Sequence, residues 1–259
     1  MLLALDVGNT ETTLGLFDGD GLTHHWRLTT TVHRTPDEWG TALTSYLTQA
    51  GHSTSEVRAG IVASVVPLVS HALGEGIGIA VGQSPTFVDA QSKLPITLDV
   101  DEPLTVGADR IVNTLAASQL YHDDCIVVDF GTATTFDCIT KDGRFIGGVI
   151  MPGVVTAANE LVRKTAKLPA AELSPPAHAI GRRTEDCIRS GVLFGTAEAI
   201  DGMIRRIRAE WPGGRKPRAV ATGGLAPLLA PLCKEIGGTD PHLTLTGLRL
   251  AAWALGLKW

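Results

Sequence analysis

The chain contains two copies of one strand–turn–strand pattern. DVGNTETTLGLFDGDGL begins at Asp6, and DFGTATTFDCITKDGRF begins at Asp129. With one gap the two copies align: Asp6 matches Asp129, Gly8 matches Gly131, and the DGDG and KDG turns coincide. Each copy is a three-stranded meander followed by helical patterns, and only two copies occur. This arrangement indicates duplicated α/β domains rather than a solenoid.

The periodicity outside the two copies predicts where helices and further strands lie. The boundary between the halves is expected near residues 115–123, which gives domains of 1–118 and 119–259. Strands are expected over 59–66 and 218–224. Helices are expected over 35–51, after Pro67, over 107–121, over 154–166, from Thr184 onward, over 225–236 and over 246–257. Trp253 and Trp259, in the C-terminal helical region, are expected to be packed.

Composition restricts the class of protein. With 259 residues and 44% apolar content, the chain can bury a large core. A net charge of −5 argues against nucleic acid or an anionic membrane as the main partner. The four cysteines form no CxxC pair, which favours buried thiols over a disulfide framework or a zinc site. Because the N-terminus has no basic region and no long apolar span follows, we expect a cytoplasmic globular protein.

Each copy places an aspartate at the end of an apolar strand, before a turn of glycine and hydroxyl residues. Such a turn exposes backbone N–H groups that can hold phosphate oxygens, and the carboxylate can hold a charge-neutralising cation. One copy alone favours an ordinary tight turn, whereas two matching copies favour a clamp on the phosphates of one nucleotide. A third element, ATGGLAPLL over 221–229, runs from a strand through two glycines into a helix. It suits a nucleotide contact, or simply a tight turn.

Neither GxGxxG in the first unit nor a P-loop pattern is present, so another phosphate-binding fold is needed. Two hairpins followed by a Gly-Gly turn resemble the acetate and sugar kinase, Hsp70 and actin superfamily. More specifically, DVGNTETTLGLF, VGADR, VVDFGTATTFD, GGVIMPG, TEDCIRSGVLFG and TGGLA resemble the type III pantothenate kinase family. These blocks follow one another in order over nearly the whole chain.

The resemblance implies two duplicated ribonuclease H-like (actin-like ATPase) domains with the active site in the cleft between them. It implies ATP-dependent phosphorylation of pantothenate at its 4′-hydroxyl, the first step of coenzyme A synthesis. The first loop would bind ATP, with Asp6 holding Mg²⁺ through water; Thr132 would also contact ATP, and Asp129 would hold a monovalent cation, K⁺ or NH₄⁺. The implied residues of the first loop are Asp6, Val7, Gly8, Asn9, Thr10, Glu11, Thr12 and Thr13.

The resemblance also assigns the substrate side. Asp109 would be the general base, and Arg110 would pair with the pantothenate carboxylate. Without the family, ADR favours the charged start of a helix, and the resemblance reverses that interpretation. Val100 stands where many members have an aromatic residue, which implies a more aliphatic pocket or a contact from another residue. The implied substrate-binding residues are Val100, Gly107, Ala108, Asp109, Arg110 and Thr184, the last near a dimer interface.

Two alternatives remain open at this point. Small residues at Gly191, Gly195 and Ala199 allow close helix packing, either inside one subunit or across the seam of a homodimer, which the resemblance favours. The chain is also compatible with a non-catalytic ATP-binding regulatory protein, or with a phosphohydrolase of the same fold. The complete set of Asp6, Asp109 and Asp129 argues against the regulatory protein, and the GADR block argues against the phosphohydrolase.

Overall fold

The computed structural model describes residues 1–259, which divide into two compact units. The first comprises Met1–Gln119 and Leu243–Trp259, and the second comprises Leu120–His242. The division after Gln119 lies next to the expected boundary, but the C-terminal segment belongs to the first unit. The expected domain 119–259 is therefore too long, because the last helix buries its apolar side against the sheet of the first unit.

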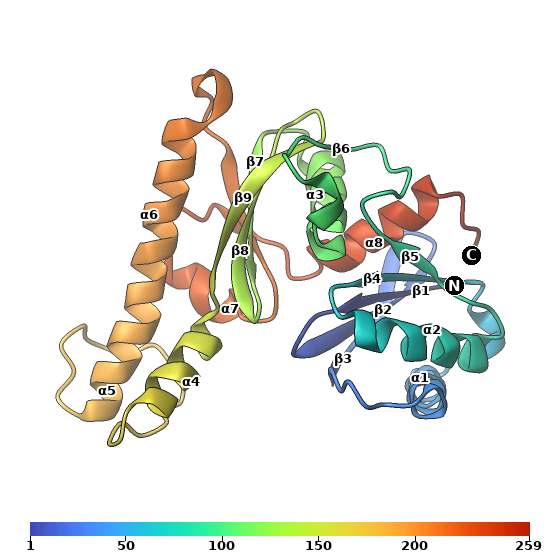
Figure 1. The fold of residues 1–259 in the computed structure, drawn as a ribbon, viewed down its shortest axis with the longest axis horizontal. Helices are drawn as coiled ribbons and strands as arrows, with labels where there is room; N and C mark the ends of the chain where they lie inside the picture. Colours follow the sequence, from blue (N-terminus) through green and yellow to red (C-terminus); the bar gives the residue numbers. More distant parts are fainter. The chain divides into compact units, whose positions relative to one another are not determined.

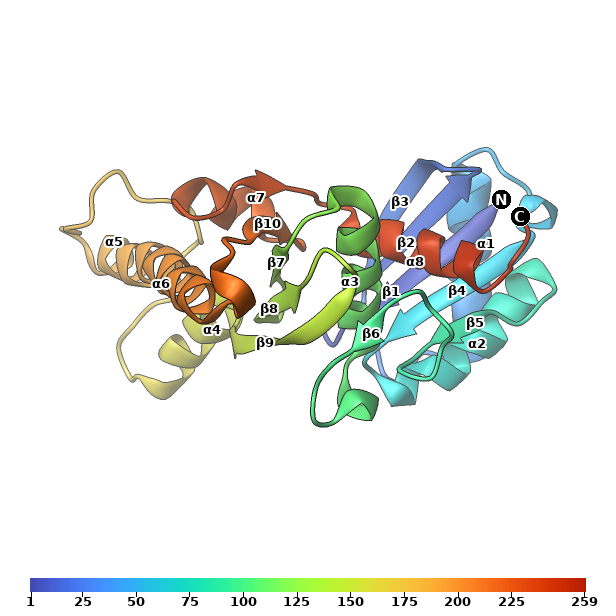
Figure 2. The same ribbon diagram turned by 90° about the horizontal axis from the view of Figure 1, so that it is seen from above.

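The first unit is a five-stranded sheet with helices on both faces (Figures 1 and 2). Its strands run in the order β3-β2-β1-β4-β5; β1 is antiparallel to β2 and parallel to β4. Helices α1 and α2 share one apolar cluster with the sheet, and α3 and α8 share the other. The elements are β1 (Leu2–Val7), β2 (Glu11–Asp18), β3 (Gly21–Thr29), α1 (Pro36–Gln49), β4 (Ala59–Ser64), α2 (Pro67–Val81), β5 (Thr86–Val88), β6 (Thr97–Leu98), α3 (Ala108–Tyr121) and α8 (Leu243–Ala254).

Local sequence explains where these helices begin. The Thr35 side chain accepts from the Glu38 amide and the Glu38 carboxylate accepts from the Thr35 amide, which is a capping box before α1. Helices α1 and α2 approach each other closely, since a Cβ on Gly76 would overlap the Trp39 side chain.

The two C-terminal tryptophans differ from each other. Trp253 of α8 is 74% exposed, so the prediction that it packs is wrong. The Trp259 indole donates to the Gly19 carbonyl oxygen.

The second unit is built on a second antiparallel meander, β7-β8-β9, extended by β10 and β11 on the β7 side. Side chains of α4, α6 and α7 form one apolar cluster with one face of its sheet. The elements are β7 (Cys125–Phe130), β8 (Ala133–Ile139), β9 (Arg144–Pro152), α4 (Val154–Lys164), α5 (Thr184–Arg189), a π-helical turn (Ser190–Phe194), α6 (Gly195–Glu210), β10 (Arg218–Thr222), α7 (Ala226–Leu229) and β11 (Gly238–Thr239).

Two helical predictions in this unit need correction. The helix expected from Thr184 does begin there, but the π-helical turn separates α5 from α6. The helix expected over 225–236 is only α7 followed by one 3₁₀ turn, Ala230–Leu232. Pro231 explains the early end, because proline lacks the N–H that an α-helix needs and its ring clashes with the preceding turn.

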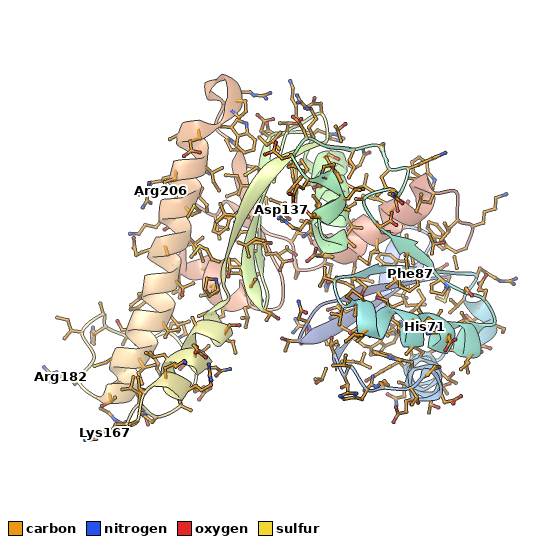
Figure 3. The ribbon with its side chains drawn as sticks, in the orientation of Figure 1. His71, Phe87, Asp137, Lys167, Arg182 and Arg206 are labelled. Carbon is orange, nitrogen blue, oxygen red and sulfur yellow. The ribbon has the colours of Figure 1, made fainter.

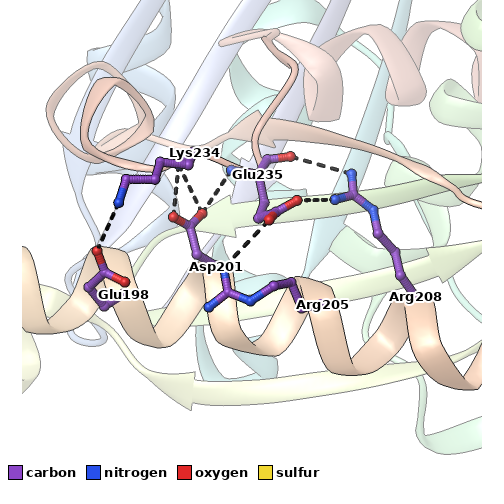
Figure 4. A network of polar contacts seen from close by, with 6 residues as sticks. All are labelled: Glu198, Asp201, Arg205, Arg208, Lys234 and Glu235. Carbon is purple, nitrogen blue, oxygen red and sulfur yellow. Dashed lines mark hydrogen bonds and ion pairs between the residues drawn. The ribbon is translucent and has the colours of Figure 1, made fainter.

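A polar network joins α6 to the segment before β11 (Figure 4). The buried carboxylate of Asp201 accepts from the amides of Lys234 and Glu235, at 2.8 and 2.9 Å. Arg205 and Arg208 of α6 pair with the Glu235 carboxylate. The buried carboxylate thus supplies an acceptor for two consecutive backbone N–H groups.

All four cysteines are free thiols. Three are buried, but Cys187 is exposed, so the expectation of buried thiols is wrong for that residue. Burial raises the pKa of the Cys125 and Cys233 thiols to about 12, so both stay protonated at neutral pH. No helix combines the length and the apolar character that a membrane crossing requires.

Candidate active site

The first loop, Gly8–Thr10, connects the antiparallel strands β1 and β2. The Gly8 amide donates to the Glu11 carbonyl oxygen at 3.0 Å and closes the turn. Asp6 lies opposite Thr13 in the strand pair, and Asn9 and Thr10 are exposed at the tip. The carboxylate and the exposed loop therefore share the carboxyl end of β1.

The second loop repeats this arrangement with one residue fewer. The Gly131 amide donates to the Ala133 carbonyl oxygen at 3.1 Å, and Asp129 lies opposite Thr135. Thr132 is exposed, as the tip residues of the first loop are. The duplication predicted from the sequence is thus confirmed in strand order, in register and in the hydrogen bond that closes each turn.

Thr12, a predicted ATP contact, is fully buried. Its hydroxyl lies 2.9 Å from the hydroxyl of Thr30, the residue that follows β3. This side chain supports the loop from inside the unit and takes no part in its exposed surface. Thr30 itself was missed by the sequence analysis, because it lies outside both copies of the loop motif.

Asp129 shares one face of the second sheet with several polar side chains. Thr222 of β10 and Thr135 of β8 are its direct strand partners, and Asp137 follows two residues later on β8 (Figure 3). Residues opposite one another, or two apart on a strand, project on the same side of a sheet. The Thr222 hydroxyl is buried and has no hydrogen-bond partner.

Gly223 keeps space open for the Asp129 carboxylate. Its φ is +89°, a region that favours glycine, and a Cβ at this position would overlap the Asp129 Oδ1 atom. A carboxylate beside an unpartnered hydroxyl is a set of oxygen donors suited to a hard cation. The donors present therefore fit a hard cation at Asp129.

Asp109 lies in the first turn of α3, where its Oδ1 atom accepts from the Arg110 amide at 2.8 Å. Burial raises the pKa of the Asp109 carboxyl, while this hydrogen bond and the Arg110 charge act in the opposite direction. The carboxylate folds back over Gly107, so that a Cβ there would stand 2.5 Å from Oδ1. Any residue other than glycine at position 107 would displace the Asp109 carboxylate.

Val65 lies between the first loop and Gly107. Its amide donates to the Val7 carbonyl oxygen at 3.1 Å, directly before Gly8. Its Cγ1 atom is 3.3 Å from the place of a Gly107 Cβ. The structure thus brings the loop and the GADR segment to one edge of the first sheet. Ala108 is buried, and Arg110 and Val100 are half-buried.

Thr184 lies at the start of α5 in the second unit, and it is not part of the second loop. It lines an apolar groove of about 630 Å³ between α4 and the α5–α6 segment. Gly191 and Gly195 line the same groove, and a Cβ on either would meet no atom within 4 Å. The groove is therefore open along the stripe of small residues.

The duplicated meanders, each with an aspartate before a Gly/Thr turn, define a protein of the actin-like ATPase and sugar kinase fold. The activator of 2-hydroxyisocaproyl-CoA dehydratase from Clostridium difficile with bound ADPNP shares the fold, with a TM-score of 0.57 and 11% identity over 99% of this chain and 93% of that chain. Component A of the Acidaminococcus fermentans (R)-2-hydroxyglutaryl-CoA dehydratase has a TM-score of 0.53 and 15% identity, covering 98% and 96%. At these identities the likeness shows the fold alone.

Sequence comparison assigns the family. The profile of type III pantothenate kinase matches residues 2–206. A type III pantothenate kinase from Desulfatibacillum aliphaticivorans is 43% identical over 251 residues, which are 96% of this chain and 97% of the relative. The chain therefore belongs to the type III pantothenate kinase family. As a kinase it is an enzyme that uses ATP and a divalent metal ion and acts on a small molecule.

Proposed function

We propose that this enzyme transfers the γ-phosphoryl group of ATP to the 4′-hydroxyl of pantothenate, giving 4′-phosphopantothenate for coenzyme A synthesis. Membership of the family supports the reaction. The observation that carries the proposal is the half-buried carboxylate of Asp109, which folds over Gly107. Gly107 lies beside Val65, whose amide bonds to Val7 directly before the first loop.

Asp109 is the general base of this proposal. Phosphoryl transfer has a loose transition state, so the hydroxyl proton leaves late and a carboxylate suffices as its acceptor. A pKa raised by burial makes the carboxylate a better acceptor than an exposed one. The Arg110 guanidinium, one residue further along α3, pairs with the carboxylate of pantothenate, and the remaining substrate contacts are Val100, Gly107, Ala108 and Thr184.

The two loops bind the phosphates of ATP through backbone N–H groups and hydroxyls. Asp6 holds the divalent cation, Mg²⁺, through water; one carboxylate together with substrate phosphates is the usual way proteins bind this ion. When bound, the cation neutralises charge on the phosphates. The contributing residues are Asp6, Val7, Gly8, Asn9, Thr10, Glu11, Thr12 and Thr13 of the first loop and Thr132 of the second, with Thr12 acting from inside.

A monovalent cation, K⁺ or NH₄⁺, binds at Asp129. The unpartnered Thr222 hydroxyl on the same face of the sheet and the space beside Gly223 support this site. Bound there, the cation supplies positive charge near the second loop. Replacement of Thr222 by valine, which keeps the shape of the side chain, should weaken K⁺ activation and leave the fold intact.

The active form is a cytoplasmic homodimer. The open groove beside Gly191 and Gly195 supports it, because small residues let two helices approach closely. Packing of this stripe inside one subunit lacks support, since a Cβ on either glycine would touch nothing in the chain. Gly195→Leu should convert the solution mass from two chains to one, and an unchanged mass would contradict the dimer.

A coupled ADP-release assay tests the reaction. Pantothenate-dependent ADP release, stimulated by K⁺ and lost in Asp109→Asn, is the expected result. ADP release without pantothenate would instead indicate a phosphohydrolase. ATP binding with no turnover under any condition would indicate the regulatory, non-catalytic alternative.

A further inference from the structure

Both loops are tied to the chain segment that follows the third strand of their own meander. In the first unit this segment begins at Thr30, just after β3, and in the second at Gly153, just after β9. The Thr30 amide donates to the Thr10 carbonyl oxygen at 2.9 Å, and the Gly153 amide donates to the Thr132 carbonyl oxygen at 3.1 Å. In the sequence alignment of the two copies, Thr10 and Thr132 are equivalent residues.

In the first unit, Thr30 adds a side-chain anchor. Its hydroxyl donates to the Gly8 carbonyl oxygen at 2.7 Å. Because this uses the only hydroxyl proton of Thr30, the buried Thr12 hydroxyl donates to the Thr30 oxygen. One half-buried threonine thus fixes the peptide groups after Gly8 and Thr10.

These anchors control the direction of the loop's N–H groups. A trans peptide is planar, and its C=O and N–H point in opposite directions. Once the Gly8 carbonyl is held toward Thr30, the Asn9 N–H is directed away from it, toward the exposed side of the tip. Thr30 therefore presets the orientation that a phosphate-binding N–H requires.

The second unit achieves the same result with a different residue. A threonine cannot replace Gly153, because a Cβ there would overlap the carbonyl oxygens of Gly131 and Thr132 in the shorter loop. The hydroxyl comes instead from Thr156, within the first turn of α4, which donates to the Thr132 carbonyl oxygen at 2.7 Å. The buried Thr134 hydroxyl, equivalent to that of Thr12, consequently has no partner.

We propose that Thr30 and Thr156 are positioning residues for ATP, one in each copy of the duplicated unit. Each holds a carbonyl of its loop, so that the loop's N–H groups already face the phosphates before ATP binds. The inference rests on the proposed function, because it takes the two loops as the phosphate-binding elements.

The test uses variants that remove one hydroxyl and keep the side-chain shape, Thr30→Val and Thr156→Val. Each should raise the Kd of Mg²⁺–ATP by about five- to tenfold, as expected for one lost hydrogen bond in a preset site. The KM for ATP should rise in parallel, while the KM for pantothenate stays unchanged. Thr30→Ser and Thr156→Ser keep the hydroxyl and should restore ATP binding.

Matched controls exist on the same elements. The Thr23 hydroxyl of β3 donates to the Leu16 carbonyl oxygen at 2.9 Å, far along the strand from the loop. The Thr165 hydroxyl, after the end of α4, donates to the Leu161 carbonyl oxygen at 2.9 Å. Thr23→Val and Thr165→Val lose the same kind of bond and should bind ATP as the wild type does.

Calorimetric titration with Mg²⁺–ATP separates the outcomes. Unchanged Kd values in Thr30→Val and Thr156→Val overturn the inference, and so does an equal loss in the two controls, which would reflect stability alone. If Thr30→Val does not fold, Thr156→Val decides the question. A wild-type protein that binds no ATP overturns the proposed function itself, before any variant is compared.

Discussion

Gly107→Ala moves the proposed general base without requiring a backbone change. A Cβ at Gly107 would stand 2.5 Å from Asp109 Oδ1, whereas ordinary contacts begin at 3.4 Å. The next atom, Val65 Cγ1, is at 3.3 Å and tolerates a small adjustment. The carboxylate must therefore retreat by about 1 Å, and a misplacement of that size in a reacting group costs about 10²-fold in rate.

The same movement breaks the hydrogen bond from the Arg110 amide to Oδ1. One such bond contributes about 1 kcal/mol, so Gly107→Ala should melt only a few degrees below the wild type. The assay is steady-state ADP release beside a thermal melt followed by circular dichroism. Gly78→Ala is the control, because a Cβ there meets no atom within 4 Å. A folded Gly107→Ala protein with kcat within about twofold of the wild type would refute the argument.

Four further predictions concern the base and the packing of each unit. Asp109→Asn should lower kcat by about 10³-fold. It should also raise the Tm at pH 7. A carboxyl whose folded pKa is raised stabilises the fold only while it is protonated, and this stabilisation is lost as the pH rises through the folded pKa. In the wild type, kcat/KM should fall as pH is lowered through this pKa, which lies above the ordinary 3.8; a limb at or below that value would contradict the burial effect. Gly247→Ala places a Cβ against the Val112 carbonyl oxygen and should lower the unfolding free energy by about 3 kcal/mol in urea titration; unchanged stability would mean that α8 does not pack on α3 as described. Asp201→Ala leaves the amide of Lys234 without its acceptor and should cost about 2 kcal/mol, whereas an unaltered midpoint would show that water replaces the carboxylate.

Much of the architecture follows from local patterns. The duplication was visible because both copies keep an aspartate, a glycine and a hairpin turn in register, and these residues form the turns that the structure contains. Helix α1 was predictable from Thr35, Pro36 and Glu38, since capping depends on neighbouring residues alone.

Other features depend on contacts between distant segments and could not be predicted. Nothing near residue 243 indicates that α8 joins the first unit; that follows from the close approach of Gly247 to α3. Thr30 supports a loop about twenty residues earlier, through bonds that no sequence spacing encodes. Thr12 matched the loop motif, and only the fold reveals that its side chain faces inward.

The most direct measurement of the central claim is the identity of the product. Incubation of the protein with ATP, Mg²⁺, K⁺ and pantothenate, followed by mass spectrometry and ³¹P NMR, should give a phosphomonoester on the 4′-hydroxyl in amounts equal to the ADP formed. Asp109→Asn, folded and able to bind ATP, should give almost none. ADP formed with inorganic phosphate and unmodified pantothenate, or a full yield of product from Asp109→Asn, would contradict the account.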